Sequence, residues 1–260
     1  MKITVLGARG SIPVEGREFL EFGGATSCVL IETEDQAIYL DAGSGIVRTP
    51  DIGDRAISIL LTHPHLDHLV GMPFFPYLSE KDRQIDFYAP ISGGMSAEEQ
   101  LDHLFSEPVW PVKMGEYSSD LKCHDISGAF DIGDVRVEFT DSVHPGGGLV
   151  YRLSSGGRSV VYATDYEYAE ESSEELIRLC KGCDLLFFDA QYTDEEFGTK
   201  KGYGHSTASQ GLKIMKESGA KSIRFVHHDP GHNDDMLRKM EEAVKSDSVS
   251  FARQGDIIFL

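Results

Sequence analysis

Eleven short runs of strand-forming residues recur along the chain, and helical patterns alternate with them from end to end. Each run has a Gly, Pro or Asp within three residues of at least one end, and these residues favour turns. Few of the runs are apolar throughout, and most of the helical patterns have a single apolar face. Two sheets facing each other with helices outside are therefore the simplest arrangement. We predict an α/β protein built as an αββα sandwich of two mixed β-sheets with outer helices.

Nothing in the sequence divides these elements into separate groups. There is no internal repeat, low-complexity tract or linker rich in Pro and Ser, so residues 1–260 are expected to form a single domain. The predicted strands are Lys2–Leu6, Cys28–Thr33, Ala37–Leu40, Ala56–Leu61, Ile85–Ala89, Val135–Phe139, Val150–Leu153, Ser159–Ala163, Asp184–Phe188, Ser222–Val226 and Asp256–Phe259. The predicted helices, the first of which has a capping-box spacing of Ser and Glu, are Ser96–Phe105, Ser172–Lys181, Ser206–Ser218 and Asp234–Ser246.

Charge restricts the class of partner. Lys and Arg total 24 against 43 Asp and Glu, a formal net charge of -19, so the average surface potential repels polyanions and anionic membranes. A small substrate is expected rather than long nucleic acid, with no membrane association. The N-terminus lacks a signal-peptide core, no apolar run approaches about 18 residues, and four cysteines are too few for a disulfide framework. A cytoplasmic location is therefore expected, and a homodimer is left open.

The densest group of histidines follows an apolar run and reads His63-Pro-His65-Leu-Asp67-His68. In an extended segment side chains two residues apart point to the same side, so His63 and His65 can bind one ion. A bend at Leu66 then turns Asp67 and His68 toward a second ion. Imidazole and carboxylate suit Zn²⁺, Mn²⁺ or Fe²⁺, and the absence of thiolate argues against a closed structural zinc site. The alternative is a polar turn whose histidines are satisfied by hydrogen bonds.

This motif resembles the metallo-β-lactamase superfamily of di-metal hydrolases, whose signature is His-x-His-x-Asp-His after a core strand, followed by a His, an Asp and a final His. The resemblance covers nearly the whole chain and implies the metallo-β-lactamase fold. It implies that His144, in Val-His-Pro-Gly, binds the first ion together with His63 and His65. It also implies that Asp165 bridges the two ions. Considered alone, Asp165 could be a helix N-cap after a strand.

The resemblance places the last ligand after the predicted strand Ser222–Val226, where two adjacent histidines compete. The alignment with the family's ending favours His227 as the ligand of the second ion, together with Asp67 and His68. It leaves His228 near the substrate.

Asp41, in Leu-Asp-Ala-Gly, resembles the family's first-motif aspartate, which lies behind the metal and orients a ligand. Its alternative interpretation is a β-turn aspartate before glycine. A finer likeness concerns Gly-His205-Ser206-Thr and the upstream run Leu185–Tyr192, which are similar to phosphonate-pathway cyclic phosphodiesterases and tRNA 3′-end-processing ribonucleases. This likeness implies that His205 and Ser206 contact the substrate, and that His205 donates a proton to the leaving alkoxide. Without the family, His205 is an ordinary first-turn residue.

We therefore predict a metal-dependent hydrolase, a di-metal phosphodiesterase that cleaves a small or cyclic phosphodiester. Two divalent ions, Zn²⁺ or Mn²⁺ with Fe²⁺ as a further candidate, would lower the pKa of a shared water so that hydroxide attacks phosphorus. Asp67, His205 and Asp41 are the predicted catalytic residues. Three alternatives stay open: a ribonuclease acting on tRNA ends, a hydrolase of esters, lactones or thioesters on the same fold, and a metal or ligand sensor without turnover.

The stretch Pro90–Asp125 fits the alternation of elements least well. It is interpreted either as a flap that covers the substrate and holds the specificity, or as a surface excursion whose Trp110 and Tyr117 pack on the core. Cys180 and Cys183 have the spacing of a redox pair, but they follow a helix and precede an apolar strand. They are expected to be buried free thiols.

Overall fold

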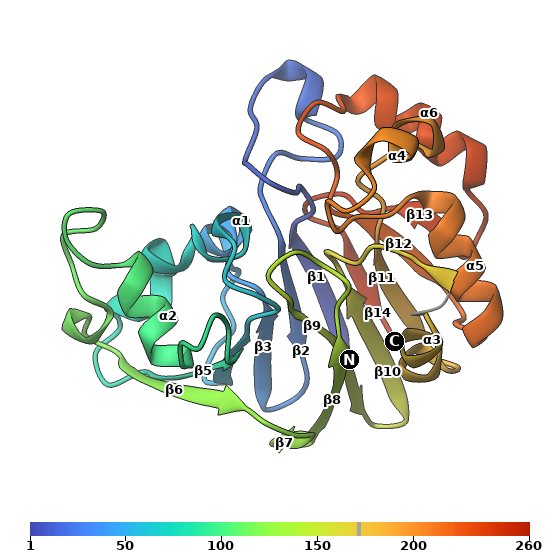
Figure 1. Cartoon of the computed structure of the whole chain (residues 1–260). Helices are drawn as coiled ribbons and strands as arrows, with labels where there is room; N and C mark the ends of the chain where they lie inside the picture. The colour runs from blue at the N-terminus through green and yellow to red at the C-terminus, as the bar shows by residue number, and fades with distance from the viewer. Residues whose placement is uncertain (171–172) are drawn as a thin grey trace.

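Two mixed sheets of seven strands face each other in the computed structural model, which describes residues 1–170 and 173–260 (Figure 1). The first sheet has the order β14-β1-β2-β3-β4-β5-β6 and the second the order β13-β12-β11-β10-β9-β8-β7. The strands of the first sheet are β1 (Lys2–Gly7), β2 (Cys28–Glu32), β3 (Gln36–Leu40), β4 (Ala56–Leu60), β5 (Gln84–Pro90), β6 (Asp120–Ile126) and β14 (Ile257–Phe259). Those of the second are β7 (Phe130–Ile132), β8 (Val135–Asp141), β9 (Leu149–Ser155), β10 (Arg158–Ala163), β11 (Leu185–Asp189), β12 (Ile223–Val226) and β13 (Val249–Phe251).

Helices cover the outer face of each sheet, so the predicted αββα sandwich is confirmed. The α-helices of the described ranges are α1 (Leu66–Leu69), α2 (Ala97–Leu104), α3 (Glu174–Cys180), α4 (Asp194–Lys200), α5 (Ala208–Ser218) and α6 (Asp234–Val244). Short 3-10 helices occur at Arg17–Phe19, Ser44–Arg48, Met72–Phe74, Pro76–Ser79 and Met114–Glu116. Ser172, the first residue of the predicted helix Ser172–Lys181, lies outside the described residues.

Three apolar clusters hold these layers together. The cluster between the sheets contains Ile3 and Val5 of β1 and Val160 of β10, all fully buried. A second lies between the first sheet and α2, and a third between the second sheet and helices α3, α5 and α6. Each buried aliphatic side chain contributes roughly 1.5–3 kcal/mol relative to exposure. The central strands β2 and β11 have helices or sheet on both faces, which explains why their residues are buried without alternation.

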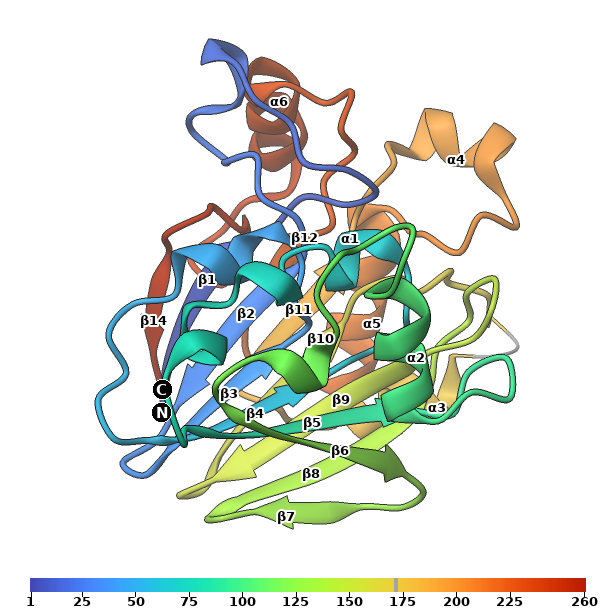
Figure 2. The ribbon, with the colours of Figure 1, turned by 90° about the vertical axis from the view of Figure 1, so that its left-hand side faces the viewer.

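The strands that end near α1 run in the same direction. Strands β3, β4, β5 and β6 are parallel, and so are β10, β11, β12 and β13. The carboxyl ends of the two parallel groups meet at one end of the sandwich, where α1, α4 and α6 also lie (Figure 2). In open α/β sheets this end is where ligands bind.

Three strands and two α-helices of the described residues were not predicted from the sequence. Strands β7 and β13 have three residues each, too short for a periodic pattern. Strand β6 is at the edge of its sheet, so polar residues occupy most of its positions. Helix α1 is a single turn, and helix α4 has no apolar face, although Thr193 and Glu196 form a capping box that was a usable signal.

The stretch Pro90–Asp125 forms helix α2 and most of strand β6. The Trp110 ring packs edge-on against Phe74 and Phe105, at centroid distances of 5.4 and 6.2 Å, and the Tyr117 hydroxyl donates to the carbonyl oxygen of Pro73. Its aromatic side chains therefore pack on the outer cluster of the first sheet, as the second interpretation expected.

Two further sequence expectations can be compared with the structure. The four cysteines are free thiols, and Cys180 and Cys183 are buried as expected. Among the described residues, no helix combines the length and the apolar character needed to cross a bilayer.

Candidate metal centre

Each predicted ligand follows the carboxyl end of a strand. His63 comes after β4, His144 after β8, Asp165 after β10 and His227 after β12. Asp67 and His68 lie on the single turn α1, whose N-cap is His65 in an extended conformation. The bend predicted at Leu66 is therefore the start of this turn.

The structure brings all seven predicted ligands together. Their ligand atoms form groups in which every pair of atoms lies within 4.8 Å, and the relevant groups are His63 with His65 and His144, Asp67 with His68 and His227, and His63 with His68 and Asp165. The first two groups are the two sites that the resemblance implied.

Asp165 lies between the two groups. Its Oδ1 is 3.5 Å from His144 Nε2 and 3.3 Å from His227 Nε2, and its Oδ2 is 3.2 Å from His68 Nε2. A carboxylate that faces histidines of both groups is suited to bridge two cations.

The donor set fits divalent ions. In the described part of the chain, the buried Nε2 of His63 has no hydrogen-bond partner, and its nearest carboxylate oxygen, from Asp165, is 3.8 Å away. An orphaned nitrogen inside a protein is costly unless something binds its lone pair. Neutral imidazole and carboxylate together are ligands for Zn²⁺, Mn²⁺ or Fe²⁺.

Asp41 lies behind the cluster, where the first-motif aspartate was expected. Its Oδ2 is 2.8 Å from His68 Nδ1, and its Oδ1 accepts hydrogen bonds from the amide and hydroxyl of Thr62. Because a carboxylate accepts only, His68 Nδ1 carries the proton, and Nε2 is free to face Asp67 and Asp165.

His205 is fixed by a residue that the sequence analysis did not single out. Its Nδ1 is 2.8 Å from Oδ2 of Asp189, which is fully buried at the end of β11. Asp189 also accepts hydrogen bonds from the amides of Asp165, Gln191 and Ser206. The signal for it was an Asp at the end of a wholly apolar strand, a place where a buried carboxylate needs several donors.

Two predicted substrate contacts are corrected by the structure. His228 packs between Phe22 and Phe251, and its Nε2 donates to the carbonyl oxygen of Ala252, so its ring faces the core and not the cluster. The Ser206 side chain is fully buried, accepting from the amide of Tyr168 and donating to a backbone carbonyl. Its hydroxyl is therefore committed inside the protein.

Backbone strain is concentrated at this centre. Asp41, Asp165 and His227 have left-handed φ values of 63°, 52° and 61°, although none of them is glycine. Such conformations cost about 1–3 kcal/mol each and persist where the surroundings enforce them. At these positions the turn directs the side chain out of the strand and into the cluster.

Burial and neighbouring charges set the protonation of the cluster. Burial lowers the pKa of His144 to about 4 and holds the pKa of His63 well below its usual value, so both are neutral imidazoles near pH 7. Burial alone would raise the pKa of Asp67, but His68 and His227 outweigh it and hold that pKa well below its usual value. His63, His144 and Asp67 therefore have the protonation states that bind cations. Burial opposes protonation of His68 and His227, but Asp165 and Asp67 outweigh it, raising the pKa of His227 to about 9 and that of His68 well above its usual value. These two histidines would each release a proton when a cation binds.

The ligands of the cluster differ in their exposure to solvent. His65 is exposed and His144 is half-buried, whereas the other five ligands are buried. A substrate would reach the centre from the side of His65 and His144.

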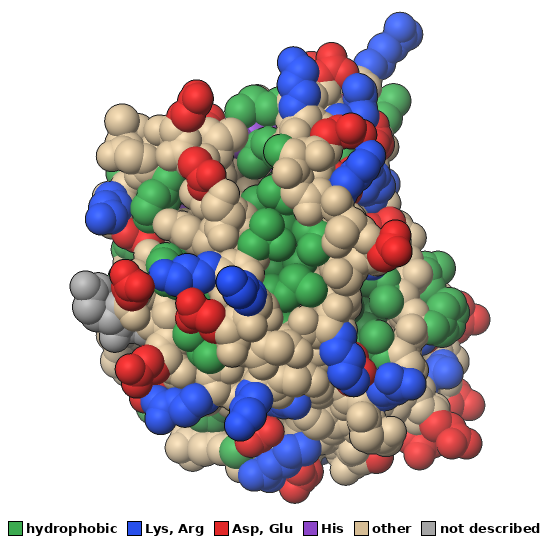
Figure 3. Space-filling model, turned by 90° about the vertical axis from the view of Figure 1, so that its right-hand side faces the viewer, with side chains coloured by type: hydrophobic (Ala, Val, Ile, Leu, Met, Phe, Trp, Pro, Cys, Tyr) green, Lys and Arg blue, Asp and Glu red, His purple; other side chains and the backbone are tan. Residues whose placement is uncertain are grey.

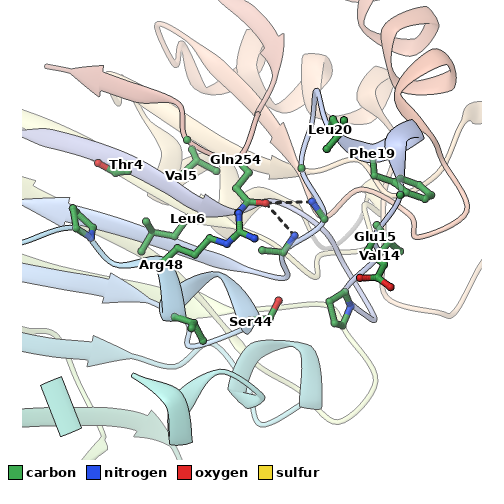
Figure 4. A pocket seen from close by; sticks show the side chains of 18 residues that line it. Thr4, Val5, Leu6, Val14, Glu15, Phe19, Leu20, Ser44, Arg48 and Gln254 are labelled. Carbon is green, nitrogen blue, oxygen red and sulfur yellow. Dashed lines mark hydrogen bonds between the residues drawn. The ribbon is translucent and has the colours of Figure 1, made fainter. Parts of the chain in front are cut away.

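A cavity of about 980 Å³ lies elsewhere, between β1 and the segment Pro13–Ala25 (Figure 4). Figure 4 shows Gln254 at its edge, where its Oε1 accepts from the amides of Gly24 and Ala25. No predicted ligand is among its described lining residues. The chemistry must therefore be argued from the histidine–aspartate cluster and not from this cavity.

Comparison with known proteins agrees with this geometry. A family model described as "Beta-lactamase superfamily domain" matches residues 37–228. The chain is similar to the probable metallo-hydrolase YhfI of Bacillus subtilis, with 24% identity over 263 residues, 98% of each chain. The crystal structure of the YhfI protein superposes with a TM-score of 0.75 at 21% identity, covering 99% of each chain.

Two other similar proteins have more specific names. A ribonuclease Z of Archaeoglobus fulgidus is 24% identical over 299 residues, 94% of this chain and 92% of that protein. The crystal structure of a "new diphosphatase from the PhnP family" superposes with a TM-score of 0.72 at 18% identity, covering 100% of this chain and 97% of the other.

Proposed function

The chain belongs to the β-lactamase superfamily and is a metal-dependent hydrolase, and we propose that it is a di-metal phosphodiesterase acting on a small or cyclic phosphodiester. The observation that carries the proposal is the pair His205–Asp189 beside the bridging Asp165. Nδ1 of His205 is 2.8 Å from Asp189 and 3.9 Å from Oδ1 of Asp165. A positioned histidine next to two cation sites is suited to an ester whose leaving group needs a proton.

Each residue of the cluster has a separate task in this proposal. One ion would be held by His63, His65 and His144. The other would be held by Asp67, His68 and His227, and Asp165 would bind both ions. Two divalent ions, Zn²⁺ or Mn²⁺ with Fe²⁺ as a further candidate, would lower the pKa of a shared water and neutralise charge on the phosphoryl oxygens. Asp41 fixes the tautomer of His68, which keeps the second site assembled.

His205 is the proposed proton donor to the leaving oxygen. Because Asp189 is a pure acceptor when ionised, Nδ1–H of His205 points at it, and Nε2 remains for the substrate. His205 is buried just before α5, whose N-cap is Thr207, so its ring is held in one orientation. General acid catalysis of this kind contributes typically about 10²–10⁴-fold.

A ribonuclease that processes tRNA ends is the second candidate, since several similar proteins bear the name ribonuclease Z. The net charge of -19 argues against it, because long polyanions are repelled on average. The face in Figure 3 carries acidic and basic side chains interspersed, without a continuous basic surface. A small diester therefore remains the preferred substrate.

The proposal is tested by assaying bis(p-nitrophenyl) phosphate beside p-nitrophenyl phosphate, a thioester, a β-lactam and a precursor tRNA, after loading with Mn²⁺ or Zn²⁺. Asp67→Ala is expected to lose metal and activity together. His205→Ala is expected to keep two ions and lose about 10²–10⁴-fold in diester turnover. Asp102→Ala and His103→Ala on exposed positions of α2 are the matched controls.

Diester-selective turnover that both site variants lose supports the proposal. Absence of diester turnover in a protein that binds two ions would refute it. Cleavage of the precursor tRNA alone would favour the ribonuclease.

A further inference from the structure

Helix α4 and the residues that follow it form an arm, residues 194–204, on the end of the sandwich that holds the metal cluster (Figure 2). The C-terminal end of the arm is held by hydrogen bonds to Glu167. The Glu167 carboxylate accepts hydrogen bonds from the amides of Gly202, at 2.7 and 2.9 Å, and Gly204, at 2.9 Å. The amide of Glu167 in turn donates to the carbonyl oxygen of Val143, next to His144. The arm is therefore tied to the same loops that carry the ligands.

The arm borders the open side of the cluster. A Cβ atom on Gly204 would lie only 2.1 Å from Cδ2 of His144, so the backbone of the arm touches this half-buried ligand. His205, the proposed proton donor, is the next residue. Because His65 and His144 mark the side from which substrate arrives, the arm forms part of the rim that a substrate must pass.

An aromatic ring and a cation are presented on this rim. The Tyr203 side chain is 61% exposed. Lys200 Nζ lies 5.5 Å from the ring centroid of Tyr203 and 5.9 Å from that of Tyr192, whose ring contacts the ring of His205 edge-on at 5.8 Å. A series of ring and cation–ring contacts therefore connects His205 to Tyr192, Tyr192 to Lys200, and Lys200 to Tyr203.

Lys200 is also free to bind an anion. The ion pairs of the described lysines involve Lys2, Lys122, Lys213, Lys221 and Lys245, so the described residues contribute no acidic partner to Lys200. A lysine held over two aromatic faces, with the Tyr192 ring between it and His205, is suited to an anionic substrate.

We propose that this arm selects a phosphodiester whose retained group carries a flat heteroaromatic ring, as a nucleoside does. The ring would stack on Tyr203, and Lys200 would pair with an anionic oxygen of the substrate. The inference rests on the proposed phosphodiesterase function and adds the substrate class. Stacking suits it because every nucleobase has a π-face, and the contact tolerates different bases.

The test uses two chromogenic diesters with the same leaving group. These are the p-nitrophenyl ester of thymidine 5′-monophosphate and methyl p-nitrophenyl phosphate, which differ only in the retained group. The readout is the ratio of their kcat/KM values with the metal-loaded full chain. A second readout is calorimetric binding of thymidine 5′-monophosphate beside ribose 5-phosphate, which needs no turnover.

Tyr203→Ala is expected to lower the kcat/KM ratio by about tenfold, the typical size of one base–aromatic contact. Tyr203→Phe should keep the ratio because it keeps the ring. Lys200→Gln should weaken thymidine 5′-monophosphate binding several-fold. Lys216→Gln, an exposed lysine further along α5, is the control and should change neither readout.

The outcomes separate this inference from the function on which it rests. Hydrolysis of both esters at equal kcat/KM by the unmodified protein would overturn the inference and leave the phosphodiesterase proposal standing. Hydrolysis of neither ester would overturn both. A nucleoside preference that survives Tyr203→Ala would show that the ring is bound elsewhere, and a Tyr203 effect confined to an oligoribonucleotide would replace the small substrate by an RNA end.

Discussion

The Nδ1 atom of His227 lies 2.9 Å from the side-chain oxygen of Gln191. An amide oxygen accepts hydrogen bonds only, so Nδ1 carries a proton and Nε2 is the nitrogen left to bind a cation. That Nε2 lies 3.2 Å from Asp67 and 3.3 Å from Asp165. Gln191 also reaches Asp229 with its side-chain nitrogen, at 3.3 Å. One glutamine therefore sets the tautomer and the direction of the last ligand.

Gln191→Leu is expected to weaken binding of the second ion by about 10–100-fold, the usual cost of losing such an outer partner. The first ion, held by His63, His65 and His144, should bind as before. Competition with a chromogenic chelator measures both affinities. Gln100→Leu, the same change in a buried glutamine of α2, is the control. Equal weakening of both ions would contradict the assigned role.

Gly204→Ala is expected to displace the His144 ring, because the new Cβ would lie 2.1 Å from it. Its matched control is Gly202→Ala. Both glycines have left-handed backbones, with φ values of 93° and 89°, but no atom lies within 4 Å of the Cβ position at Gly202. Each variant should lose about 1–2 kcal/mol from backbone strain, and Gly204→Ala about 1–3 kcal/mol more from the clash. Urea unfolding and metal titration of the two variants check this difference.

Asp184 should give the protein a stability that depends on pH. Its carboxylate accepts from the amide of Ser159 and from Lys221 and Arg158, at 2.9, 2.8 and 3.2 Å. Burial opposes ionisation, but these donors outweigh it and hold the pKa of Asp184 below the usual 3.8. With the folded pKa below the unfolded one, the stabilisation is present above about pH 4 and is lost as the pH falls through the folded pKa.

Asp184→Asn should therefore lower the free energy of unfolding by about 1–2 kcal/mol at pH 7, and by less at pH 3. Urea unfolding at the two pH values makes the comparison. Asp120→Asn, at a largely exposed carboxylate, should have little effect at either pH. A constant difference between Asp184→Asn and the unmodified protein across this range would contradict the expected linkage.

The thiols of Cys180 and Cys183 should be inert in the folded protein. Burial raises the pKa of Cys183 to about 11 and that of Cys180 well above its usual value, so little thiolate forms near pH 8. A thiol-specific chromophore should react only slowly with these two cysteines in the native protein. After unfolding it should react readily with all four cysteines. Rapid reaction at Cys180 or Cys183 in the native state would revive the redox interpretation.

Much of the metal cluster could be predicted because its ligands are chemically distinctive and close in sequence or in motif. The segment from His63 to His68 needs only strand geometry and one bend to supply ligands to both cation sites. The structure has that bend at α1. The sandwich could be predicted because most strands are buried on at least one face and show an apolar pattern. The shortest strands, β7 and β13, carry too few residues to show one.

What could not be predicted depends on tertiary contacts. His227 and His228 are adjacent and identical in type, and the resemblance favoured His227 as the ligand without giving a physical reason. That reason is the left-handed turn at His227 and the packing of His228 between Phe22 and Phe251. The role of Gln191 likewise depends on which histidine ends beside it. The sequence left two interpretations of Pro90–Asp125 open, a flap that holds the specificity or a surface excursion, and only the tertiary structure shows that the Trp110 ring packs on Phe74 and Phe105.

The ligands come from both sheets: His63, Asp67 and His68 follow a strand of the first, and His144, Asp165 and His227 follow strands of the second. Ions bound there would cross-link the two sheets, because the complete set of ligands exists only when the sheets are packed together. Their contribution to stability grows with free metal concentration through mass action. In a cell starved of metal, the protein would lose more than its activity. It would unfold more often and be degraded sooner, so that metal supply would set how much of it survives.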